Sequence, residues 1–267
     1  MSAVTDQPGA ERTSRLRLEV ADRVATVTIS CPERRNALDH ATMEALPFLF
    51  DELDRRDDVW VVMVTGEGDE AFSAGRDLKS AGPDRPVRRM PTVGPIRYPF
   101  EAVRECSKPV IAAINGWALG GGFELALACD LRIAAERARL GMPESKLGLG
   151  GQFAAVMLPR LVPAAVANEF LFFGESLTAH EAQAHGLVAR VFPDATFRAE
   201  AATYAARLAS RAPLSVRRFK AIAALSHDLS VEACLRADPY PNPYLSTDAE
   251  EGVAAWRAKR PPVWRAE

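Results

Sequence analysis

Two glutamates are the residues of this chain best suited to acid–base chemistry, and a run of glycines lies close to one of them in sequence. Glycines 120–122 follow an apolar run of strand length, residues 109–114, and Glu124 comes shortly after them at the start of an apolar, helix-like stretch. Glu144 follows a proline in the segment GMPES. Glycines let a ligand approach the backbone, and a helix N-terminus presents unpaired N–H groups and a positive dipole end. The turn is therefore suited to stabilise negative charge that develops on a ligand.

The sequence predicts different pKa values for the two carboxyl groups. Glu124 lies in the first turn of the expected helix, where the dipole and free N–H groups favour the ionised form and lower the pKa. Glu144 lies beside apolar residues, and desolvation there raises the pKa. Two carboxyl groups with separated pKa values form a base and an acid. The alternative is that both are ordinary surface carboxylates and that the glycines form a tight strand–helix junction.

A second glycine turn, AFSAGRDL with Gly75 at its centre, could supply another backbone N–H group to the same site. Its alternative role is a strand-end turn in which Asp77 caps the next helix. Ser73 is a poor candidate for a nucleophile, because no G-x-S-x-G motif surrounds it and no histidine is near it in sequence. All four histidines of the chain fall in segments that we expect to be helical and exposed, and we assign them no chemistry.

Composition and motifs exclude several classes of protein. A net charge of -2 argues against a general nucleic-acid binder. The four cysteines have no metal-ligand spacing, and we expect them to be reduced thiols in a cytoplasmic protein. The glycine run matches neither the dinucleotide-binding nor the P-loop motif. We therefore expect no metal, flavin or nicotinamide cofactor, and neither a secretory signal nor a membrane span.

The elements that must position these residues alternate between strand and helix at first and are mainly helical later. The pattern predicts a hairpin over residues 16–30, a helix capped by Asp39, a strand over 59–65 that is buried on both faces, and a helix over 123–135. Residues 82–99 carry five prolines and four arginines and predict a long loop. Later segments predict helices over 153–161, 164–173, 179–185, 198–210, 213–226 and the final stretch before Pro261.

Several motifs in one order carry a resemblance to a known family. PERRNALD, AFSAGRDL, KPVIAAINGWALGGGFELALACD and MPESKLGL lie close to motifs of the enoyl-CoA hydratase/isomerase (crotonase) family, and STDAEEGVAAWRAKRPPVW resembles its C-terminal end. The chain resembles the family over nearly its whole length. The resemblance implies an α/β fold: a crotonase (ClpP/crotonase-like) spiral of ββα units with a C-terminal helical trimerisation region. It implies a core over residues 1–195, a trimerisation region over 196–267, and a homotrimer or dimer of trimers.

The resemblance also implies a coenzyme A thioester as the small-molecule ligand. The thioester oxygen would bind in an oxyanion hole formed by the backbone N–H groups of Ala74 and Gly121, and Glu124 and Glu144 would be the catalytic pair. The residues expected to contact the coenzyme A substrate are Ala74, Gly75, Arg76, Asp77, Leu78 and Gly120. No separate cofactor, nucleic acid or membrane is expected to take part.

With both glutamates present, the implied reaction is reversible syn addition of water to a 2-enoyl-CoA. Other reactions of the family remain alternatives: Δ3-Δ2 isomerisation, dehydration of a specialised acyl-CoA, or thioester hydrolysis. A non-catalytic acyl-CoA-binding subunit is a further alternative, and RNA binding by the arginine-rich loop is disfavoured by the acidic charge balance. The stretch Gly150-Gly151-Gln152-Phe153 departs from the family's pattern beside the expected acyl pocket, so the acyl group and chain length stay open.

Overall fold

A six-stranded sheet forms the centre of the computed structural model, which describes residues 15–77 and 98–267. Most of the expected proline- and arginine-rich loop, and Leu78, lie outside the described residues. The sheet order is β1-β2-β3-β5-β7-β10, with β1 antiparallel to β2 and the other pairs parallel. Its strands are β1 Leu16–Ala21, β2 Val24–Ile29, β3 Val61–Gly66, β5 Val110–Ile114, β7 Leu131–Ala135 and β10 Arg190–Phe192.

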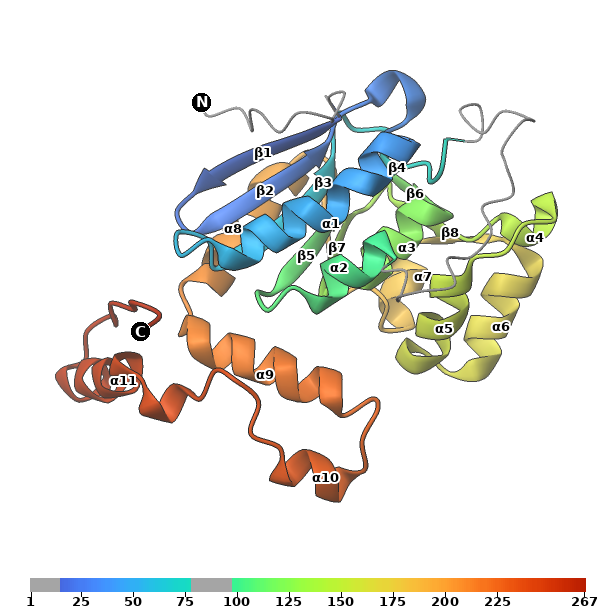
Figure 1. Ribbon diagram of the computed structural model, residues 1–267. Helices are drawn as coiled ribbons and strands as arrows, with labels where there is room; N and C mark the ends of the chain where they lie inside the picture. The colour runs from blue at the N-terminus through green and yellow to red at the C-terminus, as the bar shows by residue number, and fades with distance from the viewer. Residues whose placement is uncertain (1–14, 78–97) are drawn as a thin grey trace.

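A smaller, four-stranded sheet is built from the segments that follow the central strands. Its order is β4-β6-β8-β9, where the strands are β4 Ala71–Ser73, β6 Trp117–Leu119, β8 Arg139–Gly141 and β9 Ser176–Thr178. The chain therefore passes three times from the large sheet to the small one: β3 to β4, β5 to β6, and β7 to β8. A helix follows each passage, so the predicted succession of ββα units is confirmed (Figure 1).

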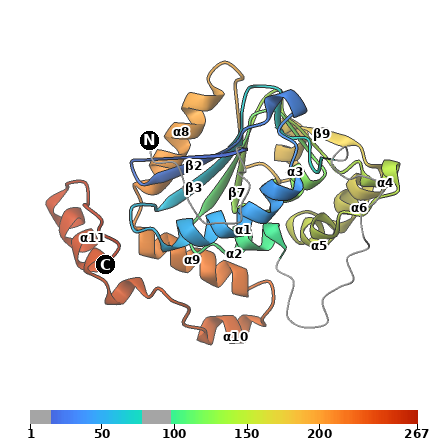
Figure 2. The same ribbon diagram turned by 45° about the horizontal axis from the view of Figure 1, so that its top comes forward.

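Helices surround the two sheets and extend the chain beyond them. They are α1 His40–Arg55, α2 Pro99–Glu105, α3 Gly121–Ala128, α4 Glu144–Leu147, α5 Gln152–Leu161, α6 Ala164–Phe173, α7 Ala179–Ala184, α8 Phe197–Ala209, α9 Pro213–Leu225, α10 Val231–Arg236 and α11 Thr247–Ala258, with 3-10 turns Pro32–Arg34 and Pro243–Leu245. Figures 1 and 2 both show α10 and α11 extending away from the sheets, whereas Lys220 of α9 donates to the Lys108 carbonyl oxygen at 3.0 Å and to the Asp130 carboxylate at 2.7 Å. By contrast, α8 packs on the large sheet through Phe197, Ala201 and Ala205.

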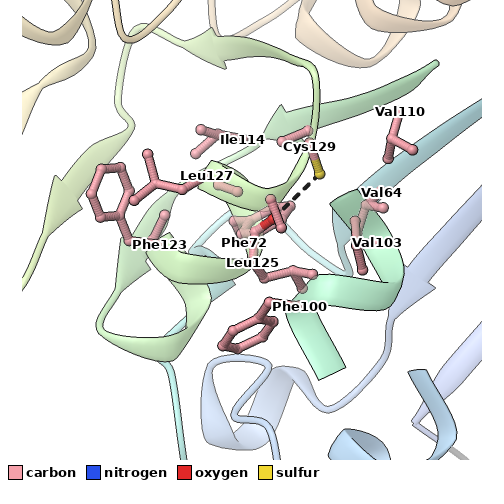
Figure 3. Packing of buried hydrophobic residues seen from close by; sticks show 14 of the residues in the cluster. Val64, Phe72, Phe100, Val103, Val110, Ile114, Phe123, Leu125, Leu127 and Cys129 are labelled. Atoms are coloured by element: carbon pink, nitrogen blue, oxygen red, sulfur yellow. Dashed lines mark hydrogen bonds between the residues drawn. The ribbon is translucent and has the colours of Figure 1, made fainter. Parts of the chain in front are cut away.

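Helix α3 lies within the main hydrophobic core and is the element that carries Glu124. Seven of its eight residues are buried, and Glu124 is the exception. Phe123 packs against Phe170 of α6 with ring centroids 5.3 Å apart, and Leu125 lies in the same cluster as Phe100 of α2 (Figure 3). A helix that is apolar on nearly all sides must be buried on nearly all sides. Its packing therefore holds the one polar side chain in a fixed place.

Several predicted elements are confirmed. The hairpin forms β1 and β2, and β3 is buried along its whole length. Asp39 caps α1 by accepting a hydrogen bond from the Thr42 N–H at 2.8 Å. The helix predicted over residues 179–185 is α7, and Thr178 and Glu181 form a capping box at its start. The later helices also start and end within about two residues of their expected limits, which is the usual uncertainty of helix boundaries.

The prediction of one helix over residues 123–135 is wrong in its second half. Helix α3 ends at Ala128, and β7 begins at Leu131. Asp130 accepts a hydrogen bond from the Val110 N–H at 2.7 Å, which joins this turn to β5. The stretch is mainly apolar, and its charged residues Asp130 and Arg132 show no clear strand period, so pairing with β5 reveals the strand. The short strand β6 and helix α10 were also not predicted.

Candidate active site

Two loops cross closely where the small sheet meets the N-terminus of α3. Gly75, after β4, has φ +88°, and a β-carbon at this position would lie 2.5 Å from the carbonyl oxygen of Leu119 and 3.0 Å from the Gly121 nitrogen. A side chain here would collide with the backbone of the β6–α3 turn. The glycine therefore allows the two loops to contact each other, as the sequence predicts for two turns facing one site.

The crossing places two backbone N–H groups beside each other. A β-carbon on Gly121 would lie 3.5 Å from the Arg76 nitrogen. Within the described part of the chain, neither the Arg76 N–H nor the Gly121 N–H donates to a backbone oxygen. Gly121 is also the first residue of α3, whose N–H groups carry the positive end of the helix dipole. These two N–H groups are placed to bind one anionic oxygen.

The structure corrects the assignment of Ala74 to the oxyanion hole. The Ala74 N–H donates to the carbonyl oxygen of Arg35 at 2.9 Å, so its hydrogen-bonding capacity is already used. The neighbouring backbone follows the same pairing, because Leu38 donates to Gly75 and Asp77 donates to Leu38. Arg76 alternates with these residues and faces the other side, toward Gly121. The sequence motif located the loop, but not which of its N–H groups points into the site.

Glu124 is half-buried and held by the start of the next long helix. Its Oε1 accepts a hydrogen bond from the Ala154 N–H of α5 at 3.0 Å. The β-carbon position of Gly151, which precedes α5, is 3.3 Å from the same oxygen. The carboxylate thus faces the N-terminus of α5, and the glycine allows the chain to pass close to it. This contact fixes one oxygen of Glu124.

Glu144 approaches the same place from α4. It is half-buried, and its Oε1 would lie 2.5 Å from a β-carbon at Gly120, which has φ +50° and ψ −123°. Its Oε2 is buried and has no hydrogen-bond partner within the described residues. A buried oxygen without a partner costs free energy, which is a feature of sites that bind a ligand or water. Gly120 therefore belongs to the site by making room for Glu144.

Both glutamates have raised pKa values, which overturns the prediction for Glu124. Burial raises the pKa of Glu124, and the hydrogen bonds from Ala154 and Phe153 and the charge of Arg76 only partly oppose it. Burial also raises the pKa of Glu144, and the nearby charge of Glu124 raises it further. The predicted lowering at Glu124 fails because desolvation within the core outweighs the helix-terminal N–H groups. The charge on Glu124 thus affects the titration of Glu144.

Buried asparagines, which the sequence did not identify, hold the loops in place. The Asn36 side chain donates to the carbonyl oxygens of Glu67 and Ala71 at 2.9 and 2.7 Å. The Asn115 side chain donates to Gly68 at 2.8 Å and accepts from the Gly66 N–H at 3.0 Å. Each amide satisfies several backbone groups between β3 and β4. The apolar sequence around Asn115 was an available signal, because a buried amide needs partners of this kind, whereas Asn36 follows two arginines.

The other residues named from the sequence differ in burial and in their contacts. Asp77 is buried, and its carboxylate accepts from Arg34 at 2.6 Å. Ser73 is fully buried, and its Oγ accepts from the Gly75 N–H at 3.2 Å, so it is structural rather than nucleophilic. All four histidines are exposed, as predicted. Gln152 is exposed, whereas Phe153 packs edge-on against Phe100 with centroids 5.7 Å apart.

Residues 15–77 and 98–267 contain no helix long and apolar enough to cross a bilayer. The same ranges hold no group of three or more histidine, cysteine, aspartate or glutamate side chains arranged to ligate a metal ion.

Sequence comparison relates the chain to proteins that act on coenzyme A thioesters. Residues 19–267 match the sequence model of the enoyl-CoA hydratase/isomerase family. The chain is 38% identical to the (E)-benzylidenesuccinyl-CoA hydratase of Thauera aromatica, covering 93% of this chain and 98% of that protein. It is 37% identical to the carnitinyl-CoA dehydratase of Salmonella typhi, covering 91% and 95%.

Structural comparison agrees with the sequence match. The crystal structure of an enoyl-CoA hydratase from Bacillus anthracis superimposes with a TM-score of 0.86, at 32% identity, covering 95% of this chain and 100% of that one. The fold, with its repeated ββα units and terminal helices, is therefore the crotonase fold. The chain belongs to the enoyl-CoA hydratase/isomerase family.

Proposed function

We propose that this protein is an enoyl-CoA hydratase that adds water reversibly, in syn fashion, to the double bond of a 2-enoyl-CoA. The observation that carries the proposal is the convergence of two half-buried carboxyl groups, Glu124 and Glu144, from different helices. A site for binding alone has no need of two desolvated carboxyl groups, whose burial is costly. Water addition needs an acceptor and a donor of protons at adjacent carbons, and the pair meets this need.

The thioester oxygen would bind between the N–H groups of Arg76 and Gly121. Conjugate addition forms a bond from the water oxygen to C3 and moves the π electrons toward the thioester oxygen, which becomes enolate-like. Two backbone donors and the start of α3 would stabilise that charge. Removing one donor from such a site typically costs about 10²–10³ in rate. Coenzyme A enters as part of the substrate, and the proposed reaction needs no other cofactor.

The two glutamates would divide the proton transfers. Glu124, fixed through the Ala154 N–H, would accept a proton from the attacking water. Glu144, with the unpartnered Oε2 and a raised pKa, would deliver a proton to C2. Both carboxyl groups can hold the same water, so the donated proton and the added hydroxyl would reach one face of the double bond. This accounts for syn addition.

Crotonyl-CoA is the first substrate with which to test hydration. Loss of the enoyl-thioester absorbance, with 3-hydroxybutyryl-CoA identified by mass spectrometry, would support the proposal. A 3-enoyl-CoA should be tested in parallel. Conversion of the 3-enoyl-CoA to the 2-enoyl isomer without any hydration would replace the proposal by an isomerase, and release of free coenzyme A would replace it by a thioester hydrolase. Binding of both thioesters without turnover would indicate a non-catalytic subunit.

We also propose that the C-terminal helices mediate a homotrimer or a dimer of trimers. The helices α9, α10 and α11 expose large apolar side chains to solvent, among them Phe219, Leu235 and Trp256 at 70%, 81% and 80% exposure. Several such residues on projecting helices are typical of an interface between proteins. Burial of these side chains against a second copy would remove them from water.

A further inference from the structure

The side chain of Arg76 begins beside Gly121, the first residue of α3. A β-carbon on Gly121 would lie 3.5 Å from Arg76 Cγ as well as 3.5 Å from its nitrogen. The same residue that offers its N–H to the site therefore also carries its side chain along the site's edge. The residue is exposed, so the guanidinium group remains accessible to a ligand.

The positive charge of Arg76 is not neutralised by another described residue. It forms no ion pair or side-chain hydrogen bond within residues 15–77 and 98–267. The adjacent carboxylate of Asp77 is engaged by Arg34 at 2.6 Å instead. The charge of Arg76 also lowers the pKa of Glu124, against the larger effect of burial, so the cation lies near the Glu124 carboxyl group.

The phosphate groups of coenzyme A do not explain this cation. In any acyl-CoA the long pantetheine arm separates the phosphates from the thioester, whereas Arg76 supplies an N–H group at the proposed thioester position itself. The acyl part of the substrate is then the part whose anionic groups would lie nearest to this guanidinium group. A guanidinium group binds a carboxylate through two parallel hydrogen bonds.

We propose that Arg76 makes this site selective for 2-enoyl-CoA substrates whose acyl chain carries a terminal carboxylate. The inference rests on the proposed hydration for its reaction, but the charge preference can be measured by binding alone. A neutral chain of the same shape would leave the guanidinium group without its partner and place apolar atoms beside it. The preference should therefore favour the carboxylate in both binding and turnover.

Pairs of thioesters that differ only in charge provide the test. Glutaconyl-CoA carries a terminal carboxylate, and 5-methylhex-2-enoyl-CoA replaces it by an isopropyl group of similar shape. A second pair, each member longer by one methylene group, tests a greater distance between the thioester and the terminal group. The saturated analogues, glutaryl-CoA and 5-methylhexanoyl-CoA, cannot be hydrated and report binding by calorimetry. The variants are Arg76→Met, which removes the charge, Arg76→Lys, which keeps it, and Arg190→Met as a control at an exposed arginine outside the site.

The wild type should prefer the carboxylate in kcat/KM and in affinity by about 10-fold or more, the effect expected of a hydrogen-bonded charge pair. Arg76→Met should abolish the preference, Arg76→Lys should retain part of it, and Arg190→Met should keep it. The ratio within each pair cancels any effect of a variant on the oxyanion hole or on Glu124. Equal affinity for the two charge forms at both lengths, or the same ratio in Arg76→Met, overturns the inference.

Failure of the proposed hydration would give a different result. If the protein binds glutaryl-CoA preferentially but hydrates neither enoyl thioester, hydration is wrong and the role of Arg76 in recognition stands. If crotonyl-CoA is hydrated but neither binding nor turnover depends on the terminal charge, the reaction stands and the role of Arg76 is wrong.

Discussion

At the residue scale, the site combines carboxyl groups that are costly to ionise with N–H groups that are ready to bind an anion. Glu124 and Glu144 are both desolvated, and each is close enough to the other for their charges to interact. Glu144 has a buried oxygen without a partner, and Arg76 and Gly121 have N–H groups without backbone acceptors among the described residues. These groups would be satisfied together by a thioester and a water molecule, which explains why the fold maintains them.

The raised pKa values predict that the two carboxyl groups of the candidate site destabilise the folded protein at neutral pH. A carboxyl group with a raised folded pKa stabilises the fold fully below its ordinary pKa, near 4.5 here, and loses that contribution as the pH rises through the folded value. Glu124→Gln and Glu144→Gln should therefore increase the free energy of unfolding in urea at neutral pH, and the increase should shrink as the pH falls below 4.5.

Glu181 provides a control of opposite sign. Hydrogen bonds from the Thr178 N–H and hydroxyl lower its pKa, so its carboxylate stabilises the fold above its ordinary pKa and loses this contribution as the pH falls. Glu181→Gln should lower the free energy of unfolding at neutral pH. If Glu124→Gln and Glu144→Gln also lower it, the desolvation of the pair is not the dominant effect.

At the element scale, strand-to-helix turns position the chemistry. The β6–α3 turn supplies the Gly121 N–H and space for Glu144, and α3 supplies Glu124. The loop after β4 supplies the Arg76 N–H, and buried amides hold it in register. Motif and periodicity were sufficient to predict these turns and the two glutamates. They could not identify which N–H faces inward, because that depends on the pairing of the loop with residues 35–38.

Gly120 offers a direct test of this geometry. An alanine there would need φ +50° and would place its β-carbon 2.5 Å from Glu144 Oε1. Gly120→Ala should therefore displace Glu144, lower kcat by about 10²-fold through misplacement, and destabilise the fold by about 1–3 kcal/mol through backbone strain. Steady-state kinetics and urea unfolding measure the two effects.

Gly150 is the matched control, because a β-carbon there meets no atom of the described residues within 4 Å. Gly150→Ala should leave both kcat and stability close to the wild-type values. Equal activity of Gly120→Ala and Gly150→Ala would show that the contact with Glu144 does not matter for turnover.

At the scale of the whole molecule, the sequence predicted the fold well where periodicity or caps were clear. The hairpin, the capped helices α1 and α7, and the buried strand β3 all follow from local patterns. The second sheet was not predicted, because strands of three residues such as β4 and β6 show no periodicity and exist only through pairing with distant segments. Likewise, α3 and β7 form one mainly apolar stretch of sequence, and only their separate pairing and packing distinguish helix from strand.

The exposed terminal helices predict the state of association. In size-exclusion chromatography with light scattering, the wild type should elute as a trimer or hexamer. Leu235→Glu, on α10, should shift the protein to smaller species by placing a charge in the interface. Phe48→Glu, an equally apolar and exposed position on α1, should not change the mass. A monomeric wild type, or an unchanged mass for Leu235→Glu, would contradict the proposed interface.

The most direct test of the central proposal is crotonyl-CoA hydration by the wild type, Glu124→Gln, Glu144→Gln and the double variant. Each glutamine keeps the shape of the site but cannot exchange a proton as a carboxyl group does. We predict a loss of about 10²–10⁴-fold in kcat for each single variant, with saturable thioester binding retained. The double variant should lose less than the product of the single losses, because the residues act as one unit. Hydration close to the wild-type rate in either single variant would contradict the two-glutamate mechanism.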